Sequence, residues 1–171
     1  MPFASLKNHL KGLPLGLITG ISIAGLMLIL YFLTPFGNII NNGSANVIAR
    51  AEAMGVKQHF LLYAIVISIF HSLLEEYYWR WFVFGRLSKA ISLKWATIIS
   101  ALAFGGYHYI LLSRFYSPLW VIILGTGVSA GGLIWAWQYH KHKSIASVWL
   151  SHCLVDAAIF IVAYQLIFKV N

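Results

Sequence analysis

The sequence predicts an all-α fold, a polytopic bundle of about five transmembrane helices, and two observations carry this prediction. Hydrophobic residues make up 60% of the 171 residues and charged residues only 9%, and the mean hydropathy is +0.80. Soluble domains carry about 25% charged residues, so this chain cannot cover itself with a polar surface. We therefore expect one integral membrane domain over residues 1–171, with a motif-bearing core at about residues 60–168.

Apolar stretches recur along the chain at the length that a bilayer requires, which is about 20 residues. The expected spans are Leu13–Leu33, Phe60–Phe84, Lys94–Leu112, Leu119–Tyr139 and Ile145–Phe168. The first is longer than the apolar core of a signal peptide, and no clear cleavage site follows it, so we interpret it as a retained span. Connections are short except at about Thr34–His59, where Ala45–Gly55 has helical character and Glu52 is expected to be solvated.

The basic residues set the expected orientation. The net charge is +8, and most Lys and Arg residues lie in short loops, where they contact anionic headgroups. With alternating spans, one side receives Lys7, Lys11, Arg86, Lys89, Lys94, Lys141 and Lys143, and the other receives Arg50, Lys57, Arg114 and Lys169. This excess predicts a multi-pass protein with a cytoplasmic N-terminus. The expected partner of these charges is the lipid bilayer and not nucleic acid.

Three of the four acidic residues lie inside apolar stretches: Glu75, Glu76 and Asp156. A carboxylate in a membrane helix costs about 2.5–3.5 kcal/mol on insertion scales. Packing alone does not explain why the chain carries two carboxylates at adjacent positions of such a helix. These carboxylates therefore indicate a functional site within the membrane.

Histidines in two further spans place ionisable groups at a similar depth. At a rise of about 1.5 Å per residue, Glu75, His108 and His152 lie about 15, 20 and 12 Å from the cytoplasmic ends of their spans. Groups on three separate helices thus converge nearer the cytoplasmic face. We interpret this convergence as water-activating chemistry.

Span two separates its two glutamates. Adjacent residues on a helix point about 100° apart, so Glu75 and Glu76 do not share a face. Glu76 can pair with Arg80, and Glu75 with His71, because both pairs are spaced i,i+4. One glutamate can be neutralised while the other projects to the bundle centre, which assigns acid and base roles. The competing interpretation puts both glutamates in the headgroup zone, within an aromatic belt at residues 77–81.

Spans three and five each carry a one-turn polar pair. Phe104 and His108 share a face, and the two glycines between them bare the backbone for another helix or a substrate. Alone, His108 would be a packing histidine, but beside the glutamate pair a functional role is favoured. His152 and Asp156 are also spaced i,i+4, and a carboxylate one turn away can fix a histidine tautomer or stabilise its charged form.

Small residues mark the remaining spans as packing elements. Gly127 and Gly131 form a GxxxG in span four, which predicts a scaffold role against spans three and five. Further small residues lie nearby, at Gly125, Ser129, Ala130 and Gly132. Gly16 and Gly20 offer a weaker copy in span one. Cys153 is expected to be a buried thiol, and as the only cysteine it excludes an internal disulfide.

The three polar motifs together resemble those of the CAAX-protease and bacteriocin-processing family of intramembrane endopeptidases. The family pattern is EExxxR, then FxxxH, then HxxxN or HxxxD, on separate membrane helices. Here the motifs read EEYYWR at residues 75–80, FGGYH at residues 104–108 and HCLVD at residues 152–156. Each motif alone is weak evidence, whereas the ordered set, from about Leu73 to Ala157, is specific.

The resemblance implies hydrolysis of a peptide bond of a membrane protein or peptide substrate within the bilayer. The implied catalytic residues are Glu75, His108, His152 and Asp156, with Glu76, Arg80 and Phe104 in support. In family terms Glu75 is the general base on a water held by His108. His152 and Asp156 would bind the developing oxyanion.

A metal is the open question of this resemblance, because the family has been described both as a metalloprotease and as a glutamate protease. Glu75, His108 and His152 could hold zinc with an open position for water. The same groups could equally act as base, water holder and oxyanion donor. We favour the arrangement that requires no cofactor, with zinc as the alternative.

Two departures shape the expected substrate and roles. The prenyl-processing branch has Asn where this chain has Asp156, and a carboxylic acid donates a hydrogen bond only when protonated, so Asp156 is as well suited to orienting His152. The chain is also shorter than the prenyl-processing enzymes. Smaller relatives are linked to bacteriocin maturation or immunity and to trimming of C-terminal sorting segments, which suits a prokaryotic cell membrane.

Two other functions compete with the protease. A membrane immunity or partner-binding protein of the same fold would need none of the motif residues intact. A proton or cation carrier would use the intramembrane carboxylates, but the chain has no internal inverted repeat of the kind many transporters show.

Overall fold

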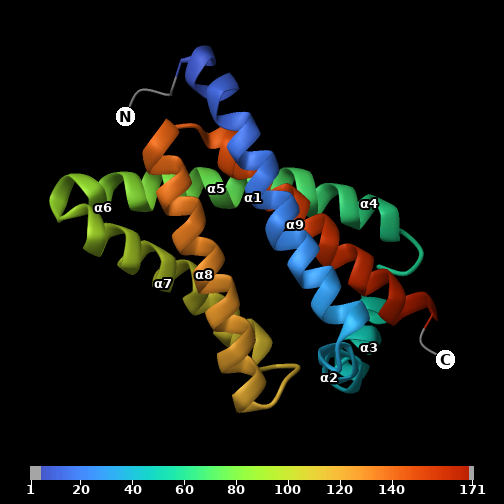
Figure 1. Cartoon of the computed structure of the whole chain (residues 1–171). Helices are drawn as coiled ribbons and strands as arrows, with labels where there is room; N and C mark the ends of the chain where they lie inside the picture. Colours follow the sequence, from blue (N-terminus) through green and yellow to red (C-terminus); the bar gives the residue numbers. More distant parts are fainter. Residues whose placement is uncertain (1–4, 170–171) are drawn as a thin grey trace.

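The computed structural model describes residues 5–169, and every regular element in that part of the chain is a helix (Figure 1). Five helices are long and apolar enough to cross a membrane. They are Leu6–Leu33, Phe60–Ala90, Leu93–Leu112, Pro118–His142 and Ile145–Phe168. The prediction of an all-α bundle of about five spans is confirmed, and four of the five helices extend beyond the expected segments.

The helices keep the order of the sequence. Four of the spans are α1 (Leu6–Leu33), α7 (Leu93–Leu112), α8 (Pro118–His142) and α9 (Ile145–Tyr164), which continues as η3 (Gln165–Lys169). The second span is one continuous helix in five segments: α4 (Phe60–Ile65), η1 (Val66–His71), α5 (Ser72–Glu76), η2 (Tyr77–Phe84) and α6 (Gly85–Ala90). The helical character expected at Ala45–Gly55 is confirmed by α3 (Ala45–Ala53), and the same connection holds a further helix that was not expected, α2 (Phe36–Asn42).

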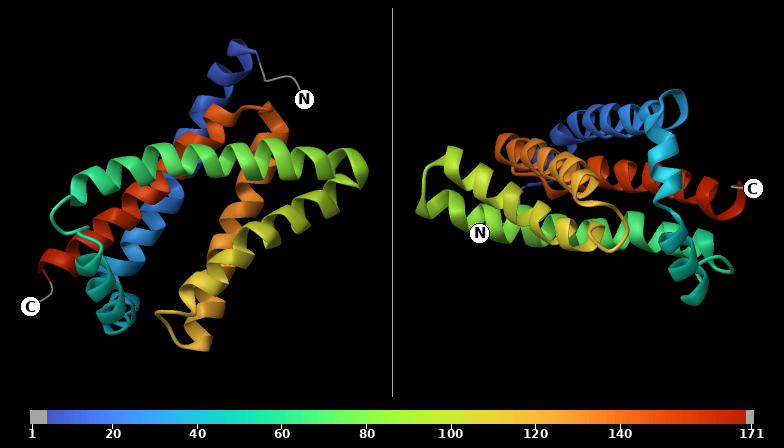
Figure 2. Two further views of the ribbon diagram at one scale, coloured as in Figure 1. Left: turned by 180° about the vertical axis from the view of Figure 1, so that it is seen from behind. Right: turned by 90° about the horizontal axis from the view of Figure 1, so that it is seen from below.

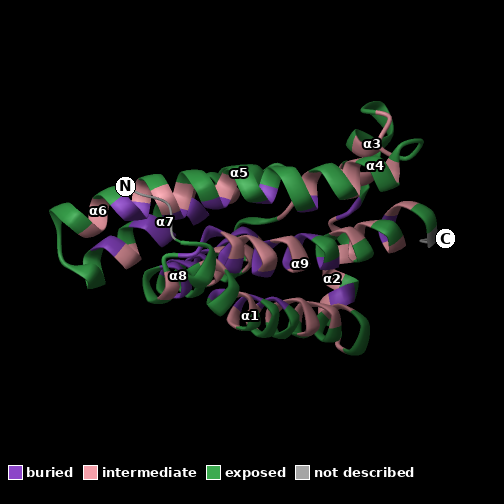
Figure 3. Cartoon of the chain, turned by 90° about the horizontal axis from the view of Figure 1, so that it is seen from above, coloured by how far each residue is buried: buried purple, intermediate pink, exposed green. Residues whose placement is uncertain are grey.

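The spans form two pairs that are bridged by the helix of residues 60–90. α1 packs along α9, and α7 packs along α8 (Figure 1). Seen from behind, the helix of residues 60–90 crosses both pairs (Figure 2). Seen from above, α9 lies between α1 and this bridging helix (Figure 3). Residues on the bridging helix and on α9 can therefore meet in the middle of the molecule.

Buried side chains gather where the bridging helix meets α7, α8 and α9, while outward faces are exposed (Figure 3). The core includes Phe84, Phe104, Trp135, Tyr139 and Val148. Many large apolar side chains point outward instead, as lipid contact requires. The buried part of the molecule is small and lies around the polar motifs.

Glycines let α1 and α9 approach closely. Gly12, Gly16 and Gly20 lie at four-residue intervals on one face of α1, and all are buried against α9. A Cβ at Gly16 would collide with the backbone of Ser147. The Ser147 hydroxyl donates a hydrogen bond of 2.6 Å to the Gly12 carbonyl. The glycine repeat that the sequence presents as the weaker one therefore forms an extensive helix contact.

The GxxxG of span four does not pack as predicted. A Cβ at Gly127 would meet nothing within 4 Å, and one at Gly131 would meet only Trp135 of its own helix. The face of α8 that contacts α7 carries Gly125, Ser129 and Gly132 instead. The scaffold contact with span three is present, but it uses the small residues beside the GxxxG and not Gly127 and Gly131, because spacing alone does not say which helix face finds a partner.

Candidate active site

The two glutamates lie on a helix whose turns are irregular on both sides. α5, which carries Glu75 and Glu76, is flanked by the π-helical segments η1 and η2. Such wide turns are rare and often occur at functional sites. Side chains satisfy part of the altered backbone: the Ile69 carbonyl accepts a hydrogen bond of 2.8 Å from the Trp149 indole N–H of α9. The distorted segment is thereby tied to the span that carries His152.

Glu76 and Arg80 form a fully buried ion pair. Arg80 Nε donates to Glu76 Oε2 at 2.9 Å, and both side chains are 0% exposed. The guanidinium also lies over the Phe104 ring, with 4.7 Å between its carbon and the ring centroid. The pairing expected from the i,i+4 spacing is present. Both side chains are therefore enclosed by the protein and do not face lipid or solvent.

His152 connects this ion pair to the other carboxylates. Its Nδ1 lies 2.8 Å from Glu76 Oε1, so the carboxylate accepts a hydrogen bond from that nitrogen. Its Nε2 lies 3.6 Å from Glu75 Oε2 and 3.5 Å from Asp156 Oδ1. Its ring is stacked on Trp135, with 4.2 Å between centroids. Glu76 therefore makes the short contact that orients His152, where the sequence indicated Asp156.

Glu75 has a separate set of partners. Its Oε1 accepts a hydrogen bond from the Tyr107 hydroxyl of α7. Its Oε2 faces His152 and lies 3.9 Å from Nδ1 of His71, the i−4 partner expected from the sequence. The side chain is 12% exposed. The two adjacent glutamates thus lie in different environments, one neutralised by an arginine and the other among a tyrosine and two histidines.

His108 stands beside the cluster rather than inside it. Its Nδ1 lies 3.1 Å from the Phe104 carbonyl of its own helix. Its ring packs against Tyr107 at 3.9 Å and Phe104 at 5.1 Å between centroids. In the described part of the chain, no His108 nitrogen lies within 4.0 Å of a carboxylate oxygen. Donation from Nδ1 to the carbonyl leaves Nε2 as the acceptor that could face a water.

The three suggested zinc ligands are not gathered into a ligand set. Among the described residues, no group of three His, Cys, Asp or Glu side chains is arranged to hold a metal ion. Glu75 and His152 are close, but His108 directs one nitrogen to its own backbone. The described side chains therefore show no preformed metal site.

A polar network behind His152 joins three spans. Trp135 Nε1 donates to Ser151 Oγ at 2.9 Å. Thr19 of α1 lies 3.0 Å from both Ser151 Oγ and Gln138 Oε1. Gln138 Nε2 in turn donates to Ser147 Oγ at 2.7 Å. The network fixes the indole on which His152 stacks, and it brings span one into the support of the site.

Sequence reasoning missed Tyr107, Trp135 and Thr19. A hydroxyl-bearing aromatic residue directly before His108 was a usable signal for Tyr107. The rarity of amides in membrane spans was a usable signal for Gln138 and the residues it binds. Nothing in the sequence places Trp135 on His152, since that contact depends on how α8 crosses α9.

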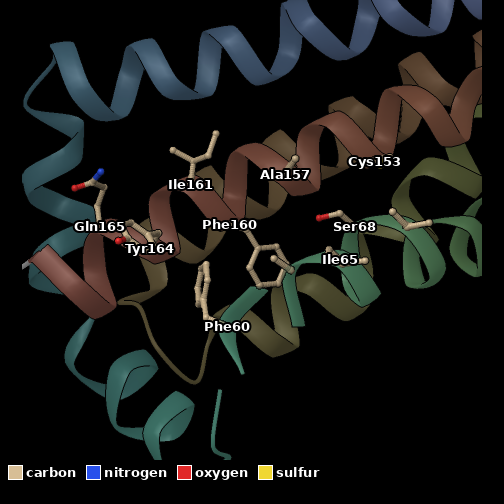
Figure 4. A pocket seen from close by; sticks show the side chains of 11 residues that line it. Phe60, Ile65, Ser68, Cys153, Ala157, Phe160, Ile161, Tyr164 and Gln165 are labelled. Atoms are coloured by element: carbon tan, nitrogen blue, oxygen red, sulfur yellow. The ribbon is translucent and has the colours of Figure 1, made fainter. Parts of the chain in front are cut away.

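An apolar groove is lined by residues of the two helices that carry Glu75 and His152 (Figure 4). It has a volume of about 470 Å³ and lies between α9 and the start of the bridging helix. Cys153 and Ala157, which follow His152 and Asp156 in sequence, are among its lining residues. Phe60, Ile65, Ser68, Phe160, Ile161, Tyr164 and Gln165 also line it. Cys153 is half-buried in this groove, so the expectation of a buried thiol is only partly met.

The five apolar helices and the buried cluster of carboxylates and histidines define an integral membrane protein with a polar site inside its spans. Residues 57–158 match a family model described as type II CAAX prenyl endopeptidase Rce1-like. This match covers more than half of the chain, and the chain belongs to that family. Neither the search of curated proteins nor the search of solved structures finds a match.

Family membership confirms the resemblance drawn from the three motifs, all of which lie within the matched region. It indicates a peptidase of the membrane, with a membrane-associated peptide as its substrate.

Proposed function

We propose that the protein is an intramembrane endopeptidase in which Glu75 activates the hydrolytic water. The observation that carries this proposal is that the two adjacent glutamates have different partners. Glu76 is fully buried and contacts Arg80 and His152. Among the described residues no arginine pairs with Glu75, and its Oε2 lies 3.6 Å from His152 Nε2. A carboxylate that is not held in an arginine ion pair is free to accept a proton during a reaction.

In the proposed reaction the water oxygen bonds to the scissile carbonyl carbon while Glu75 takes one water proton. The C–N bond then breaks, and the leaving nitrogen receives that proton from Glu75. His108 would hold the water through Nε2, since its Nδ1 is engaged by the Phe104 carbonyl. Both nitrogens of a protonated His152 donate, Nδ1 to Glu76 and Nε2 toward the oxyanion.

In this scheme Asp156 stabilises the protonated form of His152. Its Oδ1 lies 3.5 Å from His152 Nε2, which favours the protonated imidazole. A protonated Asp156 would itself donate to the oxyanion, as the Asn of the prenyl-processing branch does. No metal is required for any of these steps, and each is assigned to a side chain of this chain.

The apolar groove supports a substrate whose membrane-embedded part lies beside the scissile bond. Its volume of about 470 Å³ falls in the range of small-ligand pockets, about 300–1,000 Å³. Two of its lining residues, Cys153 and Ala157, directly follow His152 and Asp156 in the sequence. A prenyl group, a leader peptide or a sorting tail would each present such an apolar part. The proposal includes a cytoplasmic N-terminus, which the excess of basic residues favours, and a prokaryotic cell membrane.

The test uses the protein purified in detergent and a panel of fluorogenic substrates that carry prenylated, leader-type or sorting-type segments. Wild type, Glu75→Gln and chelator-treated samples are compared. Cleavage that is lost in Glu75→Gln and kept with chelator supports the proposal. Cleavage that is lost with chelator and restored by zinc would replace it with a metalloprotease. Activity that survives in Glu75→Gln would remove the proposed base.

A further inference from the structure

We propose that Tyr107 is a positioning residue for Glu75, which it reaches from the neighbouring span. This inference rests on the proposed role of Glu75 as the base. Tyr107 is not one of the fixed positions of the three family motifs. It occupies one of the variable positions of FxxxH. Its hydroxyl nevertheless donates directly to Glu75 Oε1.

Aromatic contacts on several sides hold the Tyr107 ring in place. It is nearly parallel to Trp79, with an interplanar angle of 10° and 6.3 Å between centroids. It meets Phe104 edge-on at 6.1 Å and lies 3.9 Å from the ring of His108. Because these contacts already restrict the ring, the Tyr107 hydroxyl loses little rotamer freedom when it donates its hydrogen bond to Glu75 Oε1.

The hydrogen bond determines which oxygen of Glu75 is free to react. Oε1 is engaged by Tyr107, and Oε2 is the atom that faces His152 Nε2. A carboxylate held at one oxygen cannot rotate freely, so the other oxygen keeps a fixed direction toward the groups that would bind water and oxyanion. Such orientation of a reacting group is a large part of enzymatic rate acceleration.

The tyrosine is more exposed than the carboxylate that its hydroxyl contacts. Tyr107 is 36% exposed, whereas the Glu75 side chain is 12% exposed. Removal of the hydroxyl releases Oε1 while the ring stacking is retained.

The experiment compares Tyr107→Phe with the matched control Tyr109→Phe in the full-length protein. Tyr109 lies on the same helix, and its hydroxyl contacts Thr126 Oγ1 at 3.0 Å, away from Glu75. One hydrogen bond to a charged group changes an equilibrium by about tenfold or more, so kcat of Tyr107→Phe is expected to fall by about tenfold with KM unchanged. Tyr109→Phe should keep both parameters. An unchanged kcat in Tyr107→Phe overturns the inference.

A second readout does not depend on proteolysis. Dicyclohexylcarbodiimide modifies carboxyl groups inside membranes, and mass spectrometry locates the label. The labelled fraction of Glu75 should rise in Tyr107→Phe and stay at the wild-type level in Tyr109→Phe, with Glu75→Gln as the blank. Equal labelling in wild type and Tyr107→Phe overturns the inference. If no substrate is cleaved by wild type, the proposed function fails the cleavage test and labelling alone decides the role of Tyr107.

Discussion

Nδ1 of His152 lies 2.8 Å from Oε1 of Glu76, although the two residues are on the second and fifth spans. The contact completes a chain from Arg80 through Glu76 to the imidazole, and all three side chains are at most 6% exposed. Buried charges are tolerated when each has a partner and further hydrogen bonds. The fixed ion pair therefore serves as the anchor on which the site is assembled.

Glu76→Gln should destabilise the protein far more than Glu75→Gln. The first change leaves Arg80 as an uncompensated buried charge, which costs about 3–5 kcal/mol. The second changes a residue that has no arginine partner. Thermal unfolding of the two variants in detergent measures the difference, and the pair is matched because the same chemical change is made one residue apart. Equal unfolding temperatures would contradict the anchoring role of Glu76.

Gly16→Ala should loosen the contact of α1 with α9. The added methyl group would collide with the backbone of Ser147, and overpacking of this kind costs about 1–3 kcal/mol. Gly25→Ala on the same helix is the control, because a Cβ there meets nothing within 4 Å. A lower unfolding temperature for Gly16→Ala alone is expected. Because alanine has the higher helix propensity, Gly25→Ala should not lower the unfolding temperature. A drop of the same size in both variants would contradict the packing role of Gly16.

The spans could be predicted because membrane insertion imposes a length and an apolar composition that are visible along the chain. The pairs at i,i+4 could be predicted because the helix fixes their geometry. Those rules are local, and they explain why Glu76 was correctly assigned to Arg80 and Glu75 to His71.

Contacts between helices could not be predicted in the same way. The GxxxG of Gly127 and Gly131 has the right spacing, but the faces of α8 that meet other helices are determined by how that helix crosses α7 and α9. The π-helical turns on both sides of α5 also shift the angular position of each following residue. The contact of Tyr107 with Glu75 depends on both effects, so it was missed.

Ala157→Phe should raise KM for membrane-embedded substrates. Ala157 lines the apolar groove next to Asp156, and a phenyl ring there would occupy part of the volume of about 470 Å³. The matched control is Ala130→Phe, at an exposed position on α8 outside the groove. Steady-state cleavage of substrates with large and small apolar segments measures the effect. If KM rises equally for both substrates, the groove does not hold the apolar segment.

Ser151→Ala should remove a hydrogen bond that holds Trp135, the residue on which His152 stacks. Trp135 Nε1 donates to Ser151 Oγ, and the Trp135 ring is stacked on His152. Loss of the hydroxyl leaves a buried indole N–H without its partner, which costs about 1–3 kcal/mol. Because the same ring positions His152, kcat should fall together with the unfolding temperature.

Ser113→Ala is the control for this last substitution, since the Ser113 hydroxyl makes only an exposed bond to the Ile110 carbonyl. A normal kcat in a destabilised Ser151→Ala protein would show that Trp135 holds its place on His152 through packing alone. A fall in kcat would instead mean that the hydrogen bond to Ser151 sets the orientation of the imidazole, and through Thr19 it would tie span one to the chemistry.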